Sequence, residues 1–309
     1  MSETPAYGLC DWGTSRFRIW LVDAAGNVIA ERRSDDGLDA SRTRGFAATL
    51  EEHLSHLGAP ESLPVIICGM AGSRQGWVEA NYVGVPADLH AILSGAVKIE
   101  GIQRDVRIIP GLSQSGRSPN VMRGEETQLL GAILDSNLAT GVVAMPGTHS
   151  KWVELENGKA VSFSTYLTGE LYSLLASRSI LRHSIGGAVS LASAEHPQFA
   201  EAVKLMLSGE GMLGELFGIR ASMLLENLSP EEAASRLSGL LIGAEIAGAK
   251  AKHEGKVALV ASGAMAALYS KALFFAGIDF DCVDAEEAVR KGLFVAASAV
   301  WPTQQGNNA

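Results

Sequence analysis

Two short turns in this chain combine glycine with hydroxyl side chains and could bind an anion. The first is "DWGTSR" (residues 11–16) and the second is "PGTHSK" (residues 146–151). Each lies between two predicted strands, whereas a phosphate loop of the Walker or dinucleotide type lies between a strand and a helix. A tight turn of this composition directs consecutive backbone N–H groups and hydroxyls toward one point. We therefore expect phosphate groups to bind at Gly13, Thr14, Ser15 and Arg16 in the first turn and at Gly147, Thr148, His149, Ser150 and Lys151 in the second.

Asp11 precedes the first turn, where a carboxylate would repel phosphate unless a cation or a water lies between them. Mg²⁺ keeps several of its waters when a protein binds it, so Asp11 is placed to hold Mg²⁺ through its water shell. The alternatives are that Asp11 caps the turn and that Arg16 is solvated. For Lys151 the alternatives are a phosphate contact and a strand-edge residue that aids solubility.

The elements that must hold these turns occur twice along the chain. Three predicted strands joined by tight turns open each half, at 7–33 and again at 141–164. The second set includes an Asn157-Gly158 pair, which is typical of a hairpin turn. Apolar spacing then predicts, in chain order, a helix at 41–57, strands at 64–70 and 106–112, helices at 124–136, 171–181 and 231–253, and a strand ending near 262, followed by helix, strand and helix.

This repetition predicts two related α/β domains that face each other across a central ligand cleft. We place the first domain at residues 1–137, completed by a C-terminal helix at 286–309, and the second at 138–285. The first half carries a longer insertion, at about 71–100, in which we expect substrate to bind. A chain of 309 residues is long enough for two cores.

Composition excludes several classes of protein. A net charge of −9 leaves no surplus of Lys and Arg for general nucleic-acid binding. Cys10, Cys68 and Cys282 all lie in apolar, strand-like surroundings, so we expect buried thiols of a cytoplasmic protein. We see no signal peptide and no apolar stretch of the roughly 18 residues that would suggest a membrane span. We expect neither a nucleic-acid partner nor a membrane partner, and a homodimer is possible.

The motifs resemble those of the superfamily that contains sugar kinases, Hsp70 and actin. "DWGTSRFRIW" is similar to its first phosphate motif, "MPGTHSKWV" to its second, and "ALVASGAMAALY" to its adenosine motif. The resemblance implies two duplicated ribonuclease H-like domains of the actin-like ATPase type, with Gly263 and Ala264 against the nucleoside and with ATP and Mg²⁺ as cofactors. It also implies two connecting helices, "GEETQLLGA" and "EEAVRKGLFVAA", whose small residues permit close crossing.

Five motifs narrow the resemblance to one family. "CDWGTSRFRIWLVD", "CGMAGSRQGWVEANYVGVPA", "MRGEETQLLGA", "MPGTHSKWV" and "STYLTGELYSLL" together resemble the 2-dehydro-3-deoxygalactonokinase family. Membership would imply ATP-dependent phosphorylation of the 6-hydroxyl of 2-dehydro-3-deoxygalactonate in galactonate breakdown. The alternatives are a kinase for another sugar or keto-deoxy sugar acid, and a phosphatase or ATPase of the same superfamily.

Phosphoryl transfer to a hydroxyl needs a group that accepts the hydroxyl proton. The second turn contains no Asp, but kinases that resemble glycerol kinase carry an Asp in a Gly-Asp-x-x-x-x-x-x-Gly segment just before it. "GEETQLLG" has the same order, one residue shorter, so we predict Glu125 as general base and Glu126 as its close competitor. The alternative is that both carboxylates stabilise the start of a helix. His149 is a third candidate.

A sugar acid also needs a partner for its carboxylate. "GMAGSRQGW" follows a predicted buried strand, at the end where open α/β sheets bind ligands. We predict substrate contacts from Gly72, Ser73, Arg74 and Trp77, with Arg74 on the carboxylate and Trp77 against the sugar. The alternatives are a surface arginine and a core tryptophan.

Two other functions fit parts of the pattern. A polyphosphate phosphatase of the same superfamily would not need a sugar-acid pocket. A repressor built on a kinase body would need an added DNA-binding segment, and we expect none because only residues 1–6 precede the first strand.

Overall fold

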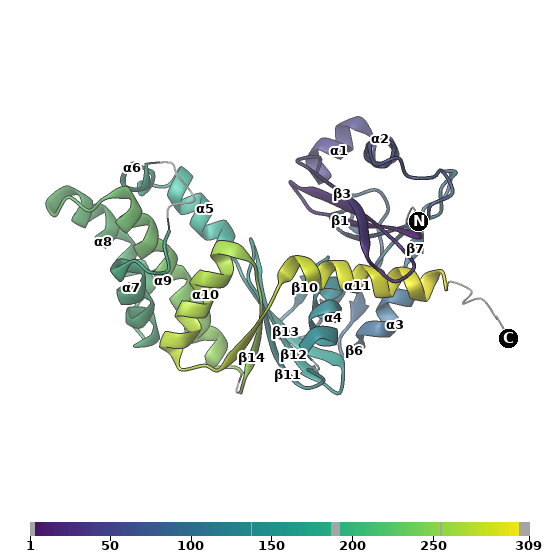
Figure 1. Ribbon diagram of the computed structural model, residues 1–309. Helices are drawn as coiled ribbons and strands as arrows, with labels where there is room; N and C mark the ends of the chain where they lie inside the picture. Colours follow the sequence, from purple (N-terminus) through teal and green to yellow (C-terminus); the bar gives the residue numbers. More distant parts are fainter. Residues whose placement is uncertain (1–3, 137, 187–191, 254, 303–309) are drawn as a thin grey trace. The chain divides into compact units, whose positions relative to one another are not determined.

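The computed structural model describes residues 4–136, 138–186, 192–253 and 255–302. Within these residues the chain is a mixed α/β protein that divides into two compact units (Figure 1). The first unit consists of residues 1–139, 157–162 and 285–309, and the second of residues 140–156 and 163–284. None of the described helices is long and apolar enough to cross a membrane.

The first unit is built on a six-stranded sheet in the order β3-β2-β1-β4-β8-β7. Strands β1, β2 and β3 run antiparallel, and β1 pairs in parallel with β4, which pairs in parallel with β8. The strands of this sheet are β1 (Tyr7–Trp12), β2 (Phe17–Val22), β3 (Val28–Ser34), β4 (Val65–Gly69), β7 (Val97–Lys98) and β8 (Val106–Ile108).

Helices and a second, small sheet complete this unit. The small sheet has the order β10-β9-β5, and β6 pairs with residues 159–160. The remaining elements of the first unit are α1 (Leu38–Arg44), α2 (Phe46–His56), a 3-10 turn (Met70–Gly72), β5 (Val83–Gly84), β6 (Ala87–Asp88), α3 (Leu89–Ser94), β9 (Leu112–Gln114), β10 (Asn120–Met122), α4 (Glu125–Ser136) and α11 (Ala285–Val300).

Alternation along β1 decides which side chains face which helix. Cys10 and Trp12 lie in a core cluster with Leu50 and Leu54 of α2. Tyr7 lies on the opposite face, where its hydroxyl donates to the carbonyl oxygen of Trp301, just beyond α11, at 2.7 Å. Because side chains alternate, Asp11 shares the face of Tyr7 and is directed away from the apolar cluster.

Helices α4 and α11 lie side by side and cross at two glycines (Figure 1). A Cβ on Gly131 would lie 1.8 Å from the carbonyl oxygen of Ala288, and one on Gly292 would lie 1.9 Å from that of Thr127. No other residue fits at so close a backbone contact. The small residues expected in two crossing helices are therefore confirmed at these positions.

The second six-stranded sheet has the order β15-β14-β11-β12-β13-β6, and its first four strands, with residues 163–166 of β13, belong to the second unit. Strands β11 and β12 run antiparallel, and β11 pairs in parallel with β14, which pairs in parallel with β15. The elements are β11 (Gly141–Met145), β12 (Ser150–Glu156), β13 (Lys159–Tyr166), α5 (Thr168–Arg178), α6 (Arg182–Ile185), α7 (Pro197–Leu207), α8 (Met212–Leu225), α9 (Pro230–Lys250), β14 (Val257–Val260), α10 (Gly263–Ala276) and β15 (Phe280–Val283).

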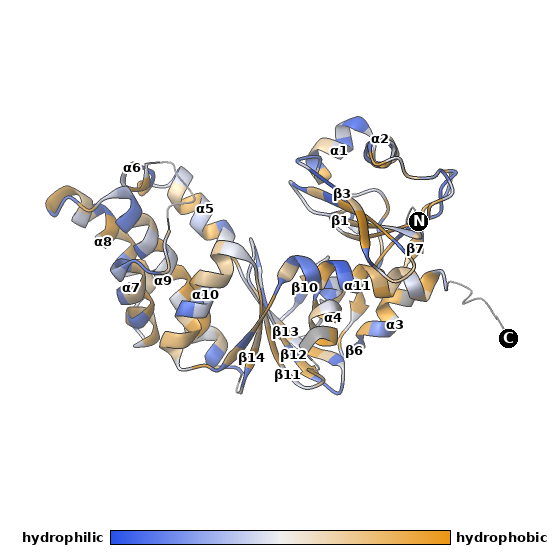
Figure 2. Cartoon of the chain, in the orientation of Figure 1, coloured by the Kyte–Doolittle hydropathy of each residue, from blue (hydrophilic) through white to orange (hydrophobic). Residues whose placement is uncertain are grey.

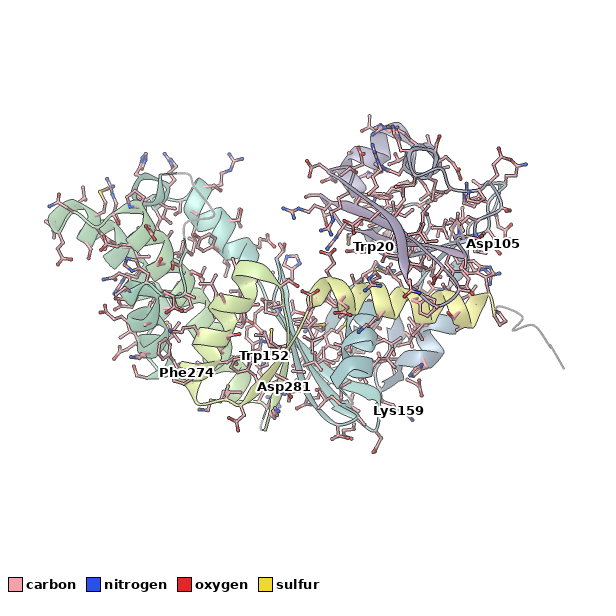
Figure 3. All side chains as sticks on the ribbon, in the orientation of Figure 1. Trp20, Asp105, Trp152, Lys159, Phe274 and Asp281 are labelled. Atoms are coloured by element: carbon pink, nitrogen blue, oxygen red, sulfur yellow. The ribbon has the colours of Figure 1, made fainter. Side chains whose placement is uncertain are left out.

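Helix α9 is the long central helix of this unit. It begins at a capping box in which Ser229 and Glu232 exchange side-chain and backbone hydrogen bonds, with Pro230 at its first position. It packs against α7, where a Cβ on Gly239 would lie 2.5 Å from the carbonyl oxygen of Phe199. Trp152 of β12, labelled in Figure 3, belongs to the core cluster that α9 and α10 form over the strands.

Helix α8 differs from α9 in that much of its apolar surface is exposed to solvent. Leu213 and Leu225 are each 81% exposed, and Ile219 is fully buried. Figure 2 shows orange, hydrophobic segments along α8. Gly218, in the middle of α8, has no neighbouring atom within 4 Å of its Cβ position.

Three predicted features differ from the structure. The helix expected over 41–57 is two helices, because Gly45 adopts a φ of 91° between α1 and α2. The strand expected over 106–112 is two, β8 and β9, in different sheets. Cys282 was expected to be buried, but it is exposed on β15 at the edge of its sheet, while Cys10 and Cys68 are buried as expected.

Candidate active site

Backbone contacts to the carbonyl groups of the first turn fix its conformation. The N–H of Gly13 donates to the carbonyl of Arg16 at 2.9 Å, and the carbonyl of Gly13 accepts from the N–H of Leu38 at 3.0 Å. A Cβ on Gly37 would lie 2.3 Å from the carbonyl oxygen of Thr14, so α1 begins directly against the turn. The side chains of Thr14, Ser15 and Arg16 are exposed. The turn thus presents hydroxyls and a guanidinium to solvent, as an anion site requires.

Asp11 lies at the end of β1, in contact with a cation of its own unit. Its Oδ2 lies 3.1 Å from Nη2 of Arg18, and its Oδ1 lies 3.9 Å from Sγ of Cys68. Burial raises the pKa of the Asp11 carboxyl, and the charge of Arg18 opposes that rise. Arg18 also lies 3.7 Å from Glu286, in the first turn of α11.

Glu125 and Glu126 begin α4 but lie in different surroundings. Glu126 is 1% exposed, and both of its carboxyl oxygens accept from the N–H of Gly124, at 3.0 and 2.7 Å. Burial, reinforced by the charge of Glu125, raises the pKa of Glu126 to about 8. Glu125 is only partly buried, and its Oε2 accepts from the N–H of Arg123 at 2.9 Å.

Cys68 lies close to both Asp11 and Glu126. Burial raises the pKa of its thiol, and the negative charges of Asp11 and Glu126 raise it further. A Cβ on Gly124, whose φ is 103°, would lie 3.2 Å from Cα of Gly69, which directly follows Cys68. The carboxyl ends of β1 and β4 therefore bring Asp11 together with the start of α4.

The four residues predicted to contact substrate lie in different surroundings, some of them buried and one exposed. Gly72 and Ser73 are buried, and the Oγ of Ser73 has no hydrogen-bond partner among the described residues. Arg74 is 81% exposed and lies 3.4 Å from Glu79. Trp77 stacks on Phe46, with ring centroids 6.0 Å apart, so its side chain contributes to the core.

Arg123 is a residue that the sequence reasoning missed. Its Nη2 donates to the carbonyl of Ala80 at 2.7 Å, and its guanidinium lies 4.3 Å from the centre of the Tyr82 ring. Its Nε and Nη1 are buried with no protein partner in the described part of the chain. A Cβ on Gly72 would lie 2.9 Å from Nη1, so the glycine leaves room for this arginine. The available signal was its position directly before the Gly124-Glu125 pair.

The second turn is held by helix α5. The N–H of Glu170 donates to the carbonyl of Thr148 at 3.0 Å, and a Cβ on Gly169 would lie 2.5 Å from the carbonyl oxygen of Gly147. Thr148 and His149 are exposed, and the His149 ring contacts the Glu170 carboxylate. The first turn of α5 therefore fixes the backbone that carries these two side chains.

Ser150 and Lys151, the last two predicted phosphate ligands, lie inside the unit. Ser150 is fully buried, and its Oγ lies 3.0 Å from the hydroxyl of Tyr269. Lys151 is 4% exposed, which contradicts the alternative of a solvated residue at a strand edge.

A cavity of about 420 Å³ opens beside the second turn, within the second unit. Its walls are mostly apolar, with hydroxyls from Thr148, Thr168 and Ser238, and this composition is typical of a small-molecule site. Of the predicted nucleotide contacts, Gly147, Thr148 and Ala264 line it, and Gly263 begins α10 next to Ala264. The lining residues that were not among the predicted contacts are Thr168, Gly169, Tyr172, Ala192, Ser238, Leu241, Ile242, Met265 and Leu268.

A metal site is not preformed by protein ligands alone. Across the residues that the structure describes, no group of three or more His, Cys, Asp or Glu side chains is placed to hold a metal ion. A single carboxylate such as Asp11 suits Mg²⁺, because that ion takes most of its ligands from water and substrate phosphates.

Comparisons of the sequence with known proteins show to which class of protein this chain belongs. A family model described as 2-keto-3-deoxy-galactonokinase matches residues 11–296. A Rhizobium meliloti protein named as a 2-dehydro-3-deoxygalactonokinase is 45% identical over 98% of this chain and 100% of its own. The 2-dehydro-3-deoxygalactonokinase of Escherichia coli is 34% identical over 96% of this chain and 99% of its own.

Comparisons with solved structures agree with these sequence comparisons. A crystal structure of a protein of that name from Sinorhizobium meliloti has a TM-score of 0.91 at 46% identity, covering 96% of this chain and 99% of its own. The activator of 2-hydroxyisocaproyl-CoA dehydratase from Clostridium difficile, solved with ADPNP, has a TM-score of 0.53 at 12% identity, covers 98% of each chain and shares the fold alone. The chain is therefore a carbohydrate kinase. It belongs to the 2-keto-3-deoxy-galactonokinase family.

Proposed function

We propose that this enzyme transfers the γ-phosphoryl group of ATP to the 6-hydroxyl of 2-dehydro-3-deoxy-D-galactonate, a step of galactonate catabolism. The observation that carries the proposal is the similarity to two kinases of this name over nearly the full length of all three chains. We further propose a cytoplasmic location, where ATP is present and the three unpaired thiols stay reduced.

The nucleotide is assigned to the second unit. Its cavity offers apolar walls for the adenosine, with Gly263 and Ala264 at the start of α10, and the adjoining turn offers Gly147, Thr148 and His149 to the phosphates. The turn of the first unit, Gly13 to Arg16, is the second phosphate contact. Asp11 would hold Mg²⁺ through water, and the ion would supply charge neutralisation on the phosphates.

The sheet order supports a duplicated, ribonuclease H-like architecture of the actin-like ATPase type. In each unit the first strand of an antiparallel set of three pairs in parallel with a later strand, β1 with β4 and β11 with β14. In each unit the proposed phosphate turn follows that first strand. We accordingly propose that residues 1–137 with 286–309 bind the sugar acid and that residues 138–285 bind the nucleotide.

Glu125 is the proposed general base. A base must be ionised and must reach the substrate hydroxyl, and Glu125 is partly exposed at the start of α4. Glu126 is enclosed, and its pKa of about 8 keeps it protonated at neutral pH. The role of Glu126 is then to hold the N–H of Gly124, and so to fix the backbone next to Glu125.

For the substrate carboxylate, geometry favours Arg123 over Arg74. Arg123 is fixed by Ala80 and Tyr82, yet two of its nitrogens and the Oγ of Ser73 have no partner among the described residues. Buried guanidinium nitrogens without hydrogen-bond partners are costly, and a bound carboxylate that accepts from them would remove that cost. Arg74 is solvated and already next to Glu79, so it gains less from a ligand.

Replacing the two arginines separates these roles. We expect Arg123→Ala to lower kcat/KM for the sugar acid by about 100-fold, the value of one or two hydrogen bonds to a charged group. Arg74→Ala should change it by about twofold or less, since an exposed ion pair contributes little. The measurement is steady-state kinetics at saturating ATP. A large effect at Arg74 with a small one at Arg123 would reverse the assignment.

The function itself is tested by ATP consumption with a panel of 2-keto-3-deoxy sugar acids and simple hexoses. We expect turnover with the galactonate derivative to exceed that with every hexose. Preference for another acid would identify a kinase of different specificity. ATP hydrolysis that does not depend on any acceptor would indicate a phosphatase or ATPase instead.

A further inference from the structure

A buried carboxylate behind the nucleotide cavity has no role in the proposal so far. Glu245 lies within α9 and is 3% exposed. Its Oε1 accepts from Nε1 of Trp152 at 2.8 Å, and its Oε2 accepts from the hydroxyl of Tyr269 at 2.6 Å and from the hydroxyl of Thr168. Burial raises the pKa of Glu245, and these three donors oppose that rise. A carboxylate is costly at such a site unless it accepts hydrogen bonds, and these three donors supply them.

The donors come from three different elements, two of which, α5 and α10, line the cavity. Trp152 is on β12, Thr168 is the first residue of α5, and Tyr269 is on α10. Thr168 itself lines the cavity, and so do Leu241 and Ile242 from the preceding turn of α9. Glu245 therefore connects β12, α5 and α10 to its own helix, and three of these elements, α5, α9 and α10, line the cavity.

The hydrogen bonds continue from Glu245 to the second turn in one order. The hydroxyl of Tyr269 has a single proton, which it donates to the Glu245 carboxylate, so in the 3.0 Å contact with Ser150 it is the serine that donates. The Oγ of Ser150 then accepts from the N–H of Gly147, at 3.5 Å. With its one proton committed to Tyr269, Ser150 has none for a phosphate. Its place is beneath the turn rather than among the ligands.

We propose that Glu245 is a positioning residue for nucleotide phosphate binding. Acting through Tyr269 and Ser150 on one side and through Thr168 on the other, it fixes the backbone of the turn that carries Gly147, Thr148 and His149. This inference rests on the proposal that the second unit binds ATP. It also moves Ser150 from the predicted phosphate ligands to the residues that support them.

Glu245→Gln is the sharpest test, because glutamine has almost the same shape. Its oxygen can accept from Trp152, but its amide then donates toward Tyr269 and Thr168, which reverses the order of hydrogen bonds that reaches Ser150. A role in packing alone would tolerate this change. Tyr269→Phe removes both contacts of the hydroxyl and serves as the second variant if Glu245→Gln fails to fold.

Ile246→Val is the matched control. Ile246 is the next residue of α9, is fully buried in the same core cluster, and has no polar side-chain atom. The experiment measures the affinity of each variant for ATP and for adenosine by calorimetry, the KM for the sugar acid, and the melting temperature. We expect both Glu245→Gln and Tyr269→Phe to weaken ATP binding about tenfold, the effect of one hydrogen bond, and to leave adenosine binding and the sugar-acid KM within twofold. Ile246→Val should lower the melting temperature without changing either affinity.

The inference is overturned if both polar variants bind ATP as tightly as the parent chain, or if they weaken ATP and adenosine equally, because the cavity rather than the turn would then have changed. A parent chain that binds no ATP would instead contradict the proposed function, so the two failures are distinguishable. Thr168→Ser, which keeps the hydroxyl, should bind ATP normally, whereas Thr168→Val should resemble Tyr269→Phe.

Discussion

Two adjacent glutamates at the start of α4 differ in exposure and in hydrogen-bond partners. Glu125 is partly exposed and accepts from the N–H of Arg123, while Glu126 is enclosed and holds the N–H of Gly124. Neighbours on a helix point in directions about 100° apart, so one can face the substrate while the next faces the core. The sequence predicted Glu125 as the base with Glu126 as its close competitor, but it gave no physical difference between them, because both fit the start of a helix.

Kinetics of the two amides should reflect this difference. We expect Glu125→Gln to lower kcat by at least about 100-fold with little change in KM, because a general base acts mainly in the transition state. Glu126→Gln should retain most of the turnover, since the amide can still accept from Gly124. The measurement is steady-state kinetics for both substrates. Near-normal turnover in both variants would exclude both glutamates as the base.

The raised pKa of Glu126 also has a consequence for stability. The folded chain keeps this proton up to about pH 8, whereas an unfolded glutamate loses it near pH 4.3. Folding is therefore favoured at low pH by this group, and its contribution is lost as the pH rises from about 4.3 through 8. We expect the parent chain to lose stability relative to Glu126→Gln between pH 5.5 and 8.5, as measured by urea unfolding. A constant difference across this range would show that the pKa is not raised.

At the scale of single residues, the sequence identified the turns but not what lies behind them. Gly13 and Gly147 stand out because glycine and hydroxyls repeat at matching places along the chain. Arg123 and Thr168 gave no comparable signal, because their roles depend on which backbone lies beside them after folding. Burial is similarly invisible in a short motif, and so Ser150 was grouped with its exposed neighbours.

Among the elements, close helix crossing is the feature most sensitive to a single methyl group. Gly131→Ala would place a Cβ at 1.8 Å from the carbonyl oxygen of Ala288, so α4 and α11 must separate. We expect a loss of at least about 1–3 kcal/mol in the free energy of unfolding, the usual cost of overpacking. The measurement is chemical denaturation.

Gly218→Ala on α8 is the control for this change. Its Cβ position is open, so alanine should be neutral or should stabilise the chain by up to about 1 kcal/mol through helix propensity. If the two substitutions had equal effects, the crossing would not depend on the glycine at 131.

Element boundaries show where sequence patterns stop being informative. The three strands predicted within 7–33 are β1, β2 and β3, and an Asn-Gly pair marked the turn between β12 and β13. The division of one expected helix at Gly45, and of one expected strand between β8 and β9, arises from tertiary packing. An apolar run is compatible with one long element or two short ones, and only the neighbouring sheet decides.

For the whole molecule, the two ligands should protect different segments. A non-hydrolysable ATP analogue should slow hydrogen exchange near 147–149 and 264–268, and also near 13–16 in the turn of the first unit, whereas the sugar acid should slow it near 69–74 and 123–126. At a ligand concentration of about 100 Kd the expected stabilisation is about 2.7 kcal/mol, enough to change exchange rates clearly. Hydrogen exchange with mass spectrometry measures both. Protection of the first unit alone by the nucleotide would contradict the assignment.

The solvent-facing cysteine on β15 has a practical consequence for such experiments. With Cys10 and Cys68 enclosed, Cys282 is the one native position that a maleimide fluorophore can reach. Burial and the charge of Asp284 raise the pKa of its thiol, so labelling will be faster in mildly alkaline buffer. The native chain therefore comes with a single attachment point in the second unit, so a dye can be placed there without any engineered substitution.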